Sequence, residues 1–177
     1  MSKPKPVNWE LIENTDNPQL YTLVNGLIQK YHSGQEGILG VNIMLMWQFN
    51  IKPDQDGHIK VASITKSTDK NRELRDHDVI IGINKGTWEI MEQHQKEATI
   101  DNLLERIAVS KDSNDNPKED DKSRIIYRLK NPETVVSSII QRRHNTTVLE
   151  IQEFLIEKME TAGAEKGSYI YNNLSGK

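Results

Sequence analysis

Five histidines are the side chains in this sequence best suited to binding a metal or moving a proton: His32, His58, His77, His94 and His144. Each stands in a different segment, and no two have the i and i+4 spacing that places two ligands on one face of a helix. A site assembled from them by the fold stays open, although unrelated surface histidines are commoner. Spacing alone therefore predicts no histidine metal site.

Other catalytic signatures are missing from the sequence. No G-x-S-x-G or S-x-x-K motif stands where a strand leads into a helix. Gly34, Gly37 and Gly40 are not followed by the lysine and helix of a phosphate-binding loop. The chain has no cysteine, which excludes disulfides and thiolate metal sites.

The stretch from His77 to Ile107 has the pattern of a strand, a turn and a long helix. The β-branched run Val79–Ile83 is typical of a strand buried on both faces. The turn is predicted at Asn84–Gly86, with Thr87 as the helix N-cap. The apolar spacing after Thr87 predicts one helix of about twenty residues, frayed or bent in its polar middle.

This stretch resembles the phage metallopeptidase family, in which a D-[VI]-[VI] strand leads through a tryptophan-containing turn into a helix ending A-L-x-D-H-E-L-x-H. The sequence follows that pattern at Asp78-Val79-Ile80, Trp88, Ala98, Asp101 and Leu104. The resemblance runs from about Tyr31 to His144. It implies a zincin-like fold and a phage protein.

The residues that would hold and use zinc in that family are replaced here. Asn102 stands in place of the first histidine, Leu103 in place of the glutamate and Arg106 in place of the second histidine. An amide is a poor zinc ligand, a leucine cannot take a proton, and a guanidinium carries fixed positive charge. A further histidine of the family, at the start of the next helix, is replaced by Asn131-Pro132-Glu133. The resemblance thus implies a degenerate member without catalytic residues, metal or cofactor.

The loop from Ser110 to Ser123 contains an incomplete calcium motif. Asp112, Asn114 and Asn116 fit positions 1, 3 and 5 of an EF-hand. Pro117 stands at the required glycine and Ser123 at the bidentate glutamate. We therefore predict a flexible, solvated insertion rather than a calcium site.

Basic side chains gather late in the sequence, at Lys122, Arg124, Arg128, Lys130, Arg142 and Arg143. They can present a positive face to phosphates or to an acidic protein, although ordinary solvated charge is the favoured interpretation. The sharper hypothesis is a partner-binding patch of Arg106, Arg142 and Arg143, set against local pairing of Arg106 with Asp101 or Glu105. The tyrosines of the tail, Tyr169 and Tyr171, are the second candidate for partner binding.

The expected fold is α+β: a small, mostly antiparallel sheet packed with about four helices. The strands are expected at Val41–Asn50, His58–Ile64 and Asp78–Ile83. The helices are expected to begin near Pro18, Trp88, Pro132 and Val148, the last with a capping box formed by Thr147 and Glu150.

Length and composition suggest one domain. The 177 residues, 35% of them hydrophobic, divide into an extended lead-in (1–16), a single domain (17–161) with a flexible loop (110–123), and a tail (162–177). A net charge of −3 favours neither a nucleic-acid binder nor a DNA mimic. No apolar run is long enough to span a bilayer, which predicts a soluble protein of the host cytoplasm or of the virion.

We expect a catalytically inactive phage protein that works by binding another protein, either a host factor that it blocks or a virion component that it joins. Two alternatives stay open: a residual metal-dependent hydrolase, and a nucleic-acid-binding module that uses the basic patch. The sequence does not indicate an oligomeric state.

Overall fold

The computed structural model describes residues 8–49, 51, 60–131 and 137–163, and its framework is a four-stranded mixed sheet. The strands are β1 (Trp9–Leu11), β2 (Ile43–Gln48), β3 (Ala62–Lys66) and β4 (Val79–Asn84), in the spatial order β1-β2-β4-β3. The α+β class and a largely antiparallel sheet are confirmed, since two of the three strand pairings are antiparallel. The central pair, β2 with β4, is parallel, because β3 occupies the edge rather than the middle of the sheet.

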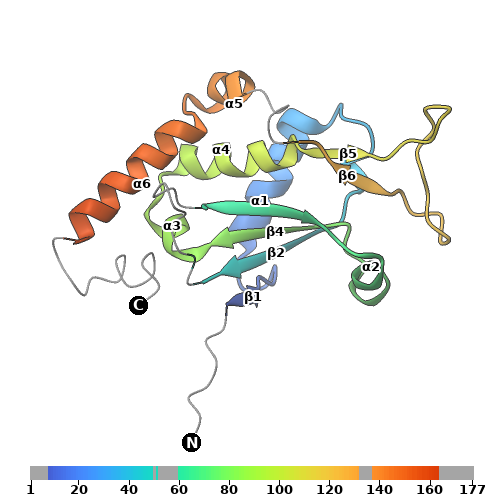
Figure 1. Ribbon diagram of the computed structural model, residues 1–177, viewed down its shortest axis with the longest axis horizontal. Coiled ribbons are helices and arrows are strands. Elements are labelled where there is room, and N and C mark those ends of the chain that lie inside the picture. The colour runs from blue at the N-terminus through green and yellow to red at the C-terminus, as the bar shows by residue number, and fades with distance from the viewer. Residues whose placement is uncertain (1–7, 50, 52–59, 132–136, 164–177) are drawn as a thin grey trace, which may run out of the picture.

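The apolar character of β2 and β4 explains their central position. Leu45, Ile81 and Ile83 have no exposed surface, and they face helix α1 (Pro18–Leu27), which lies behind the sheet in Figure 1. Asn17 caps α1 by accepting a hydrogen bond from the Leu20 N–H. The helix then widens into a π-helical turn, η1 (Ile28–His32), which leaves the His32 side chain buried.

The predicted long helix is two helices. α3 (Lys85–Ile90) is capped by Asn84, whose side chain accepts from the Thr87 N–H, so the cap lies three residues before the predicted one. α4 (Gln93–Leu104) begins anew after Met91, and its Gln95 side chain accepts from the Glu92 N–H. Each helix therefore has its own capping residues at its N-terminus. The predicted single helix is interrupted between Ile90 and Gln93, where one helix ends and the next begins.

Strand β1 and helix α2 (Asp69–Arg75) are among the elements that were not predicted from the sequence. Residues 9–11, placed in the extended lead-in, form edge strand β1 against β2. The polar connection before β4 contains α2, capped by Thr68. Inside it, Arg72 is only 4% exposed and pairs with Asp78, which ties α2 to the start of β4.

A smaller sheet follows α4, and its connection projects as an arm at the right of Figure 1. It consists of β5 (Ile107–Val109) and β6 (Tyr127–Leu129), paired antiparallel. In the arm, Asp112 accepts from the N–H groups of Asn114 and Asn116, so its carboxylate caps a turn. Asp120 does the same eight residues later, accepting from the N–H groups of Lys122 and Arg124. The segment predicted as a flexible loop thus contains two turns of the same design.

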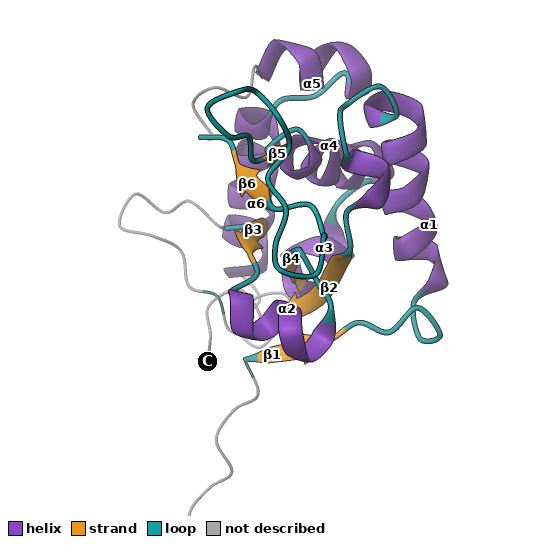
Figure 2. Cartoon of the chain, turned by 90° about the vertical axis from the view of Figure 1, so that its right-hand side faces the viewer, coloured by secondary structure: helices purple, strands orange, loops and turns teal. Residues whose placement is uncertain are grey.

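The last helices are α5 (Ser137–His144), which lies above α4 at the top of Figure 2, and α6 (Val148–Gly163), which also contacts α4. The predicted capping box is confirmed, since Thr147 accepts from the Glu150 N–H and Glu150 from the Thr147 N–H. The start of α5 near Pro132 and the tail with Tyr169 and Tyr171 lie outside the described residues. None of the helices that the structure describes is long and apolar enough to cross a bilayer.

Gly37 gives a test of how the turn before β2 packs against Val109 of β5. It has a φ of +73°, and a Cβ there would lie 2.5 Å from Cγ2 of Val109. We expect Gly37→Ala to lower the free energy of unfolding by about 1–3 kcal/mol, measured by urea denaturation. Gly26→Ala is the matched control. Gly26 is helical and a Cβ there meets nothing within 4 Å, so its stability should rise by up to about 1 kcal/mol. Equal stability of the two variants would contradict this packing.

Candidate functional site

The end of α4 and the two residues after it carry two pairs of polar side chains at i, i+4 spacing, which places each pair on its own side of the helix axis. Asp101 and Glu105 point inward, and Asp101 has no exposed surface. Asn102 and Arg106 are the positions where the family resemblance expects metal ligands, and they form the neighbouring, outward side. The two sides are described in turn.

The inward face holds a buried cluster centred on Asp101. Nε2 of His32, from η1, lies 2.6 Å from Oδ1 of Asp101, and Nε2 of His144, from α5, lies 2.8 Å from Oδ2. Nη1 of Arg143 donates to both carboxylate oxygens at 3.0 and 3.1 Å. The fold thus joins two of the five histidines, which are 1% and 6% exposed.

Arg143 is held on several sides. Its Nη1 also donates to Oε1 of Glu105 at 2.8 Å, and its guanidinium lies over the Tyr31 ring at 4.7 Å. The ring of Tyr31 meets that of His144 edge to face. Arg143 is thereby an internal cation that serves two carboxylates.

Both ring nitrogens of His32 have partners in the interior. Nδ1 lies 3.2 Å from Oε1 of Gln35, and Nε2 faces the Asp101 carboxylate. The Gln35 side chain in turn donates through Nε2 to the Ile107 carbonyl. These contacts hold the imidazole ring in one orientation.

Two opposing effects set the ionisation of Asp101. Burial acts to raise the pKa of Asp101, but hydrogen bonds from His32, His144 and Arg143 together outweigh it and leave the pKa below its ordinary value. Asp101 is therefore a carboxylate at neutral pH, and the cluster balances that charge with donors from η1 and α5.

The cluster includes the one group of metal-ligand type that the described residues bring together: His32, Asp101 and Glu105, with one donor atom each within 4.8 Å of one another. Two ligand atoms on a tetrahedral zinc stand about 3.3 Å apart. The 2.6 Å between His32 and Asp101 is a hydrogen-bond distance, and the Arg143 guanidinium is bonded to both carboxylates. In this arrangement the residues do not fit a zinc ion.

The outward face of α4 does not fit zinc either. Asn102 lines a cavity of about 230 Å³ between α4, α6 and the start of β3. Leu103 is 6% exposed and belongs to the hydrophobic core. Arg106 donates from Nε to the Lys130 carbonyl at 3.3 Å, and the Lys130 N–H donates to the Arg106 carbonyl at 2.7 Å. An amide, an alkyl group and a guanidinium cannot replace the ligands and the base of a zinc hydrolase.

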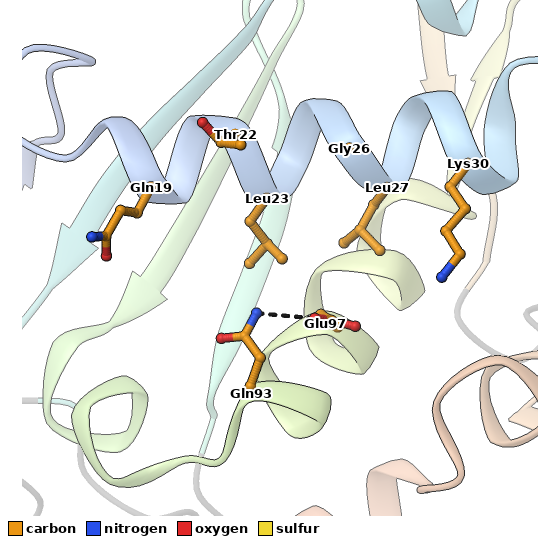
Figure 3. A pocket seen from close by; sticks show the side chains of 8 residues that line it. All are labelled: Gln19, Thr22, Leu23, Gly26, Leu27, Lys30, Gln93 and Glu97. Carbon is orange, nitrogen blue, oxygen red and sulfur yellow. Dashed lines mark hydrogen bonds between the residues drawn. The ribbon is translucent and has the colours of Figure 1, made fainter.

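A groove of about 390 Å³ lies between α1 and α4 (Figure 3). Leu23 and Leu27 point into it from α1, and Gln93 and Glu97 line it from α4. Gln93 donates to Oε1 of Glu97, whose Oε2 lies 3.8 Å from Nδ1 of His144. Glu97 therefore stands between the groove and the Asp101 cluster.

The structure separates the residues predicted to bind a partner. Arg142 is exposed, whereas Arg143 points inward to Asp101 and Glu105. Arg106 is half-buried and bonded to a main-chain carbonyl, rather than paired with an adjacent acid. In the wider basic region, Lys122 and Arg124 form ion pairs with acids of α2 and the arm. These five cations therefore do not form one free positive surface.

One signal in the sequence could have revealed the cluster. Asp101 stands between Ile100 and Leu103-Leu104 on the apolar side of a helix. A carboxylate in that position needs partners within the core. The partners, His32 and His144, are too distant in the sequence for any local pattern to indicate them.

Replacement of Arg143 tests whether the cluster holds the fold together. Arg143→Met should lower the free energy of unfolding by about 3–5 kcal/mol, because Asp101 then loses a buried counter-charge. Arg142→Met, on the exposed side of the same helix, is the control and should change stability by no more than about 0.5 kcal/mol. Urea denaturation measures both, and an equal small loss in the two variants would argue against a structural cluster.

The ionisation of Asp101 predicts a dependence on pH. Its folded-state pKa lies below the ordinary value of about 3.9, so its contribution to stability is complete above that pH and is lost as the pH falls through the folded-state pKa. The stability difference between the parent and Asp101→Asn should therefore be largest above about pH 4 and shrink in stronger acid. Urea denaturation over a pH series measures it, and a difference that grows on acidification would refute the assignment.

Comparison with known proteins gives one match. A family model described as "Putative phage metallopeptidase" matches residues 12–160. No curated protein and no solved structure matches the chain. The matched region includes the sheet from β2 onward, α4 with both of its polar faces, and the α5 residues that bind Asp101.

Proposed function

Since the chain belongs to the phage metallopeptidase family, we propose that it is a member that no longer hydrolyses peptides and instead works by binding another protein. The observation that carries this proposal is Arg106, whose guanidinium donates to the Lys130 carbonyl at the position where the family resemblance places a zinc ligand. A fixed positive charge there opposes the binding of a metal cation.

The neighbouring positions support the same conclusion. Zinc-dependent hydrolysis needs a set of nitrogen or carboxylate ligands, a water on the metal and a base that takes its proton. Asn102 offers an amide and Leu103 an alkyl group buried in the core. Leucine cannot take a proton, so the general base is missing at the position where the family resemblance places it.

A protein-binding role uses the same scaffold as a recognition surface. The partner is a host factor that the chain blocks or a virion component that it joins, so the protein acts in the host cytoplasm or in the virion. Arg142 is exposed on α5, and Arg106 lies at the end of α4; both can offer hydrogen bonds to carboxylates. Tyr169 and Tyr171 of the tail are further candidates.

One observation favours residual metal-dependent hydrolysis as a second function: the His32, Asp101 and Glu105 donors lie within 4.8 Å of one another. Their burial counts against it. His32 and Asp101 are 1% and 0% exposed, so the peptide bond of a substrate could not reach a metal ion bound between them. Nucleic-acid binding is weaker still, because Lys122, Arg124 and Arg143 are engaged by acids.

The proposal predicts metal content directly. The purified protein, dialysed against zinc and then against metal-free buffer, should retain far less than one zinc per chain and should not cleave unstructured peptides. Elemental analysis and a peptidase assay measure the two. A chain that retains about one zinc and cleaves peptides would overturn the proposal.

A gain-of-ligand variant is the matched comparison. Asn102→His, Leu103→Glu and Arg106→His together should raise zinc retention above that of the parent without producing an efficient peptidase, since position 131 would still lack an imidazole. The binding role is tested with the tagged chain in host lysate. Arg106→Glu with Arg142→Glu should weaken retention of a specific protein, whereas equal retention would move the binding surface elsewhere.

A further inference from the structure

The cavity of about 230 Å³ beside Asn102 has an apolar floor and an open mouth. Val61, Leu103 and Ile151 line it and are 7%, 6% and 2% exposed, so they form its floor. Lys60 and Val148 also line it and are exposed, so they stand at its mouth. A ligand can therefore enter from solvent and place an apolar group against the floor.

The charge at the mouth of this cavity has one sign. Of the nine described residues that line the cavity, Lys60 alone is charged. Its ammonium forms no ion pair with the acids in the described part of the chain. The Lys60 carbonyl accepts from Nδ2 of Asn84 at 3.5 Å, which ties this end of the strand to β4. A lysine at the mouth of a pocket without acids favours a ligand with an anionic group.

The amide of Asn102 is the second polar group that a ligand can use. Asn102 is half-buried, and its side chain makes no hydrogen bond to the residues that the structure describes. An amide has N–H donors and a carbonyl acceptor, which match the two polar groups of a peptide unit. A carboxylate offers acceptors only and leaves the Asn102 oxygen without a donor. The site therefore favours a ligand that has an N–H as well as a negative charge.

The volume of the cavity limits the occupant to about one residue. Pockets that take a whole drug-sized molecule have about 300–1,000 Å³. A cavity of about 150 Å³ is large enough for benzene. The 230 Å³ at Asn102 lies between these sizes and suits one aliphatic side chain with the main-chain groups attached to it.

We infer that this cavity binds the carboxyl-terminal residue of a partner protein. The inference rests on the proposed binding function and names the binding site and the part of the partner that enters it. A chain end combines a carboxylate, a main-chain N–H and a side chain in one residue. The carboxylate pairs with Lys60, the N–H donates to the Asn102 oxygen, and an aliphatic side chain contacts Leu103 and Ile151.

Short peptides test the site on the full chain. The probe is a labelled peptide of about six residues, glycine and serine followed by a leucine with a free carboxylate. Its control has the same sequence with the terminal carboxylate converted to a carboxamide, which removes the charge and keeps the leucine. Fluorescence anisotropy should show that the free-carboxylate peptide binds at least about tenfold more tightly, the effect of one hydrogen bond to a charged group.

Two substitutions remove the polar groups of the site one at a time. Lys60→Met should weaken binding of the free-carboxylate peptide at least about tenfold and leave the carboxamide peptide unchanged. Asn102→Leu keeps the side-chain volume and should weaken binding about threefold to tenfold, the effect of one neutral hydrogen bond. The matched controls, Lys66→Met and Asn71→Leu, replace exposed residues outside the cavity and should bind like the parent. Circular dichroism verifies that all four variants are folded.

The inference is overturned if the parent does not bind, if the two peptides bind equally, or if Lys60→Met binds like the parent. Octanoate separates a chain end from a free acid with an apolar tail, because octanoate has no N–H to donate. If octanoate displaces the peptide from the parent, and Asn102→Leu binds the peptide as the parent does, the ligand is a free acid and the chain-end assignment is wrong.

The same preparations separate this inference from the proposed function. Zinc content is measured alongside peptide binding, and mass spectrometry shows whether the peptide is cleaved. A zinc-retaining chain that cleaves peptides, and whose binding depends on Lys60 and Asn102, would refute the loss of hydrolysis and keep the chain-end site. A zinc-free, inactive chain that does not bind the peptide would refute the chain-end site alone.

Discussion

The buried carboxylate of Asp101 is the interaction on which the arrangement of the helices depends. A charge without exposed surface is strongly destabilising unless charged or polar donors surround it. Here the donors come from the π-helical turn after α1 and from the end of α5, far apart in the sequence. The need to satisfy one side chain of α4 therefore fixes where α5 lies, and through α5 where α6 begins.

The Asp101 cluster is separate from the positions where the family resemblance expects metal ligands. Asp101 and Asn102 are adjacent on α4 but face different surroundings, one the interior and the other the cavity beside β3. The hydrogen bonds and ion pairs of Asp101 come from η1 and α5. Asn102 and Arg106 take no part in them, so a change at either position leaves these bonds in place.

Local patterns predicted the elements that depend on local chemistry. The helix at Pro18, the buried strand β4 and the capping box at Thr147 follow from caps and apolar spacing within a few residues. The break between α3 and α4 was missed because Asn84 and Gln95 provide two separate helix starts inside one continuous apolar pattern. Strand β1 is too short for its alternation to stand out.

The candidate site depended on contacts that local patterns do not contain. The order of β3 and β4, and hence the parallel central pair, is decided by packing rather than by the strands' own sequences. The meeting of His32, Asp101 and His144 likewise follows from the tertiary fold. The replaced residues Asn102, Leu103 and Arg106 were found because a family pattern, and not a physical periodicity, marks their positions.

The parallel pairing of β2 with β4 has a consequence for the order in which the protein folds. β3 and β4 are joined by α2 alone and can pair early, whereas β2 must wait for this unit before it gains its parallel neighbour. Contacts between distant segments close large loops and slow the search for the native topology. Strand β1 is an edge strand of three residues that pairs only with β2. It is therefore the strand of this sheet from which we expect amide hydrogens to exchange with solvent first.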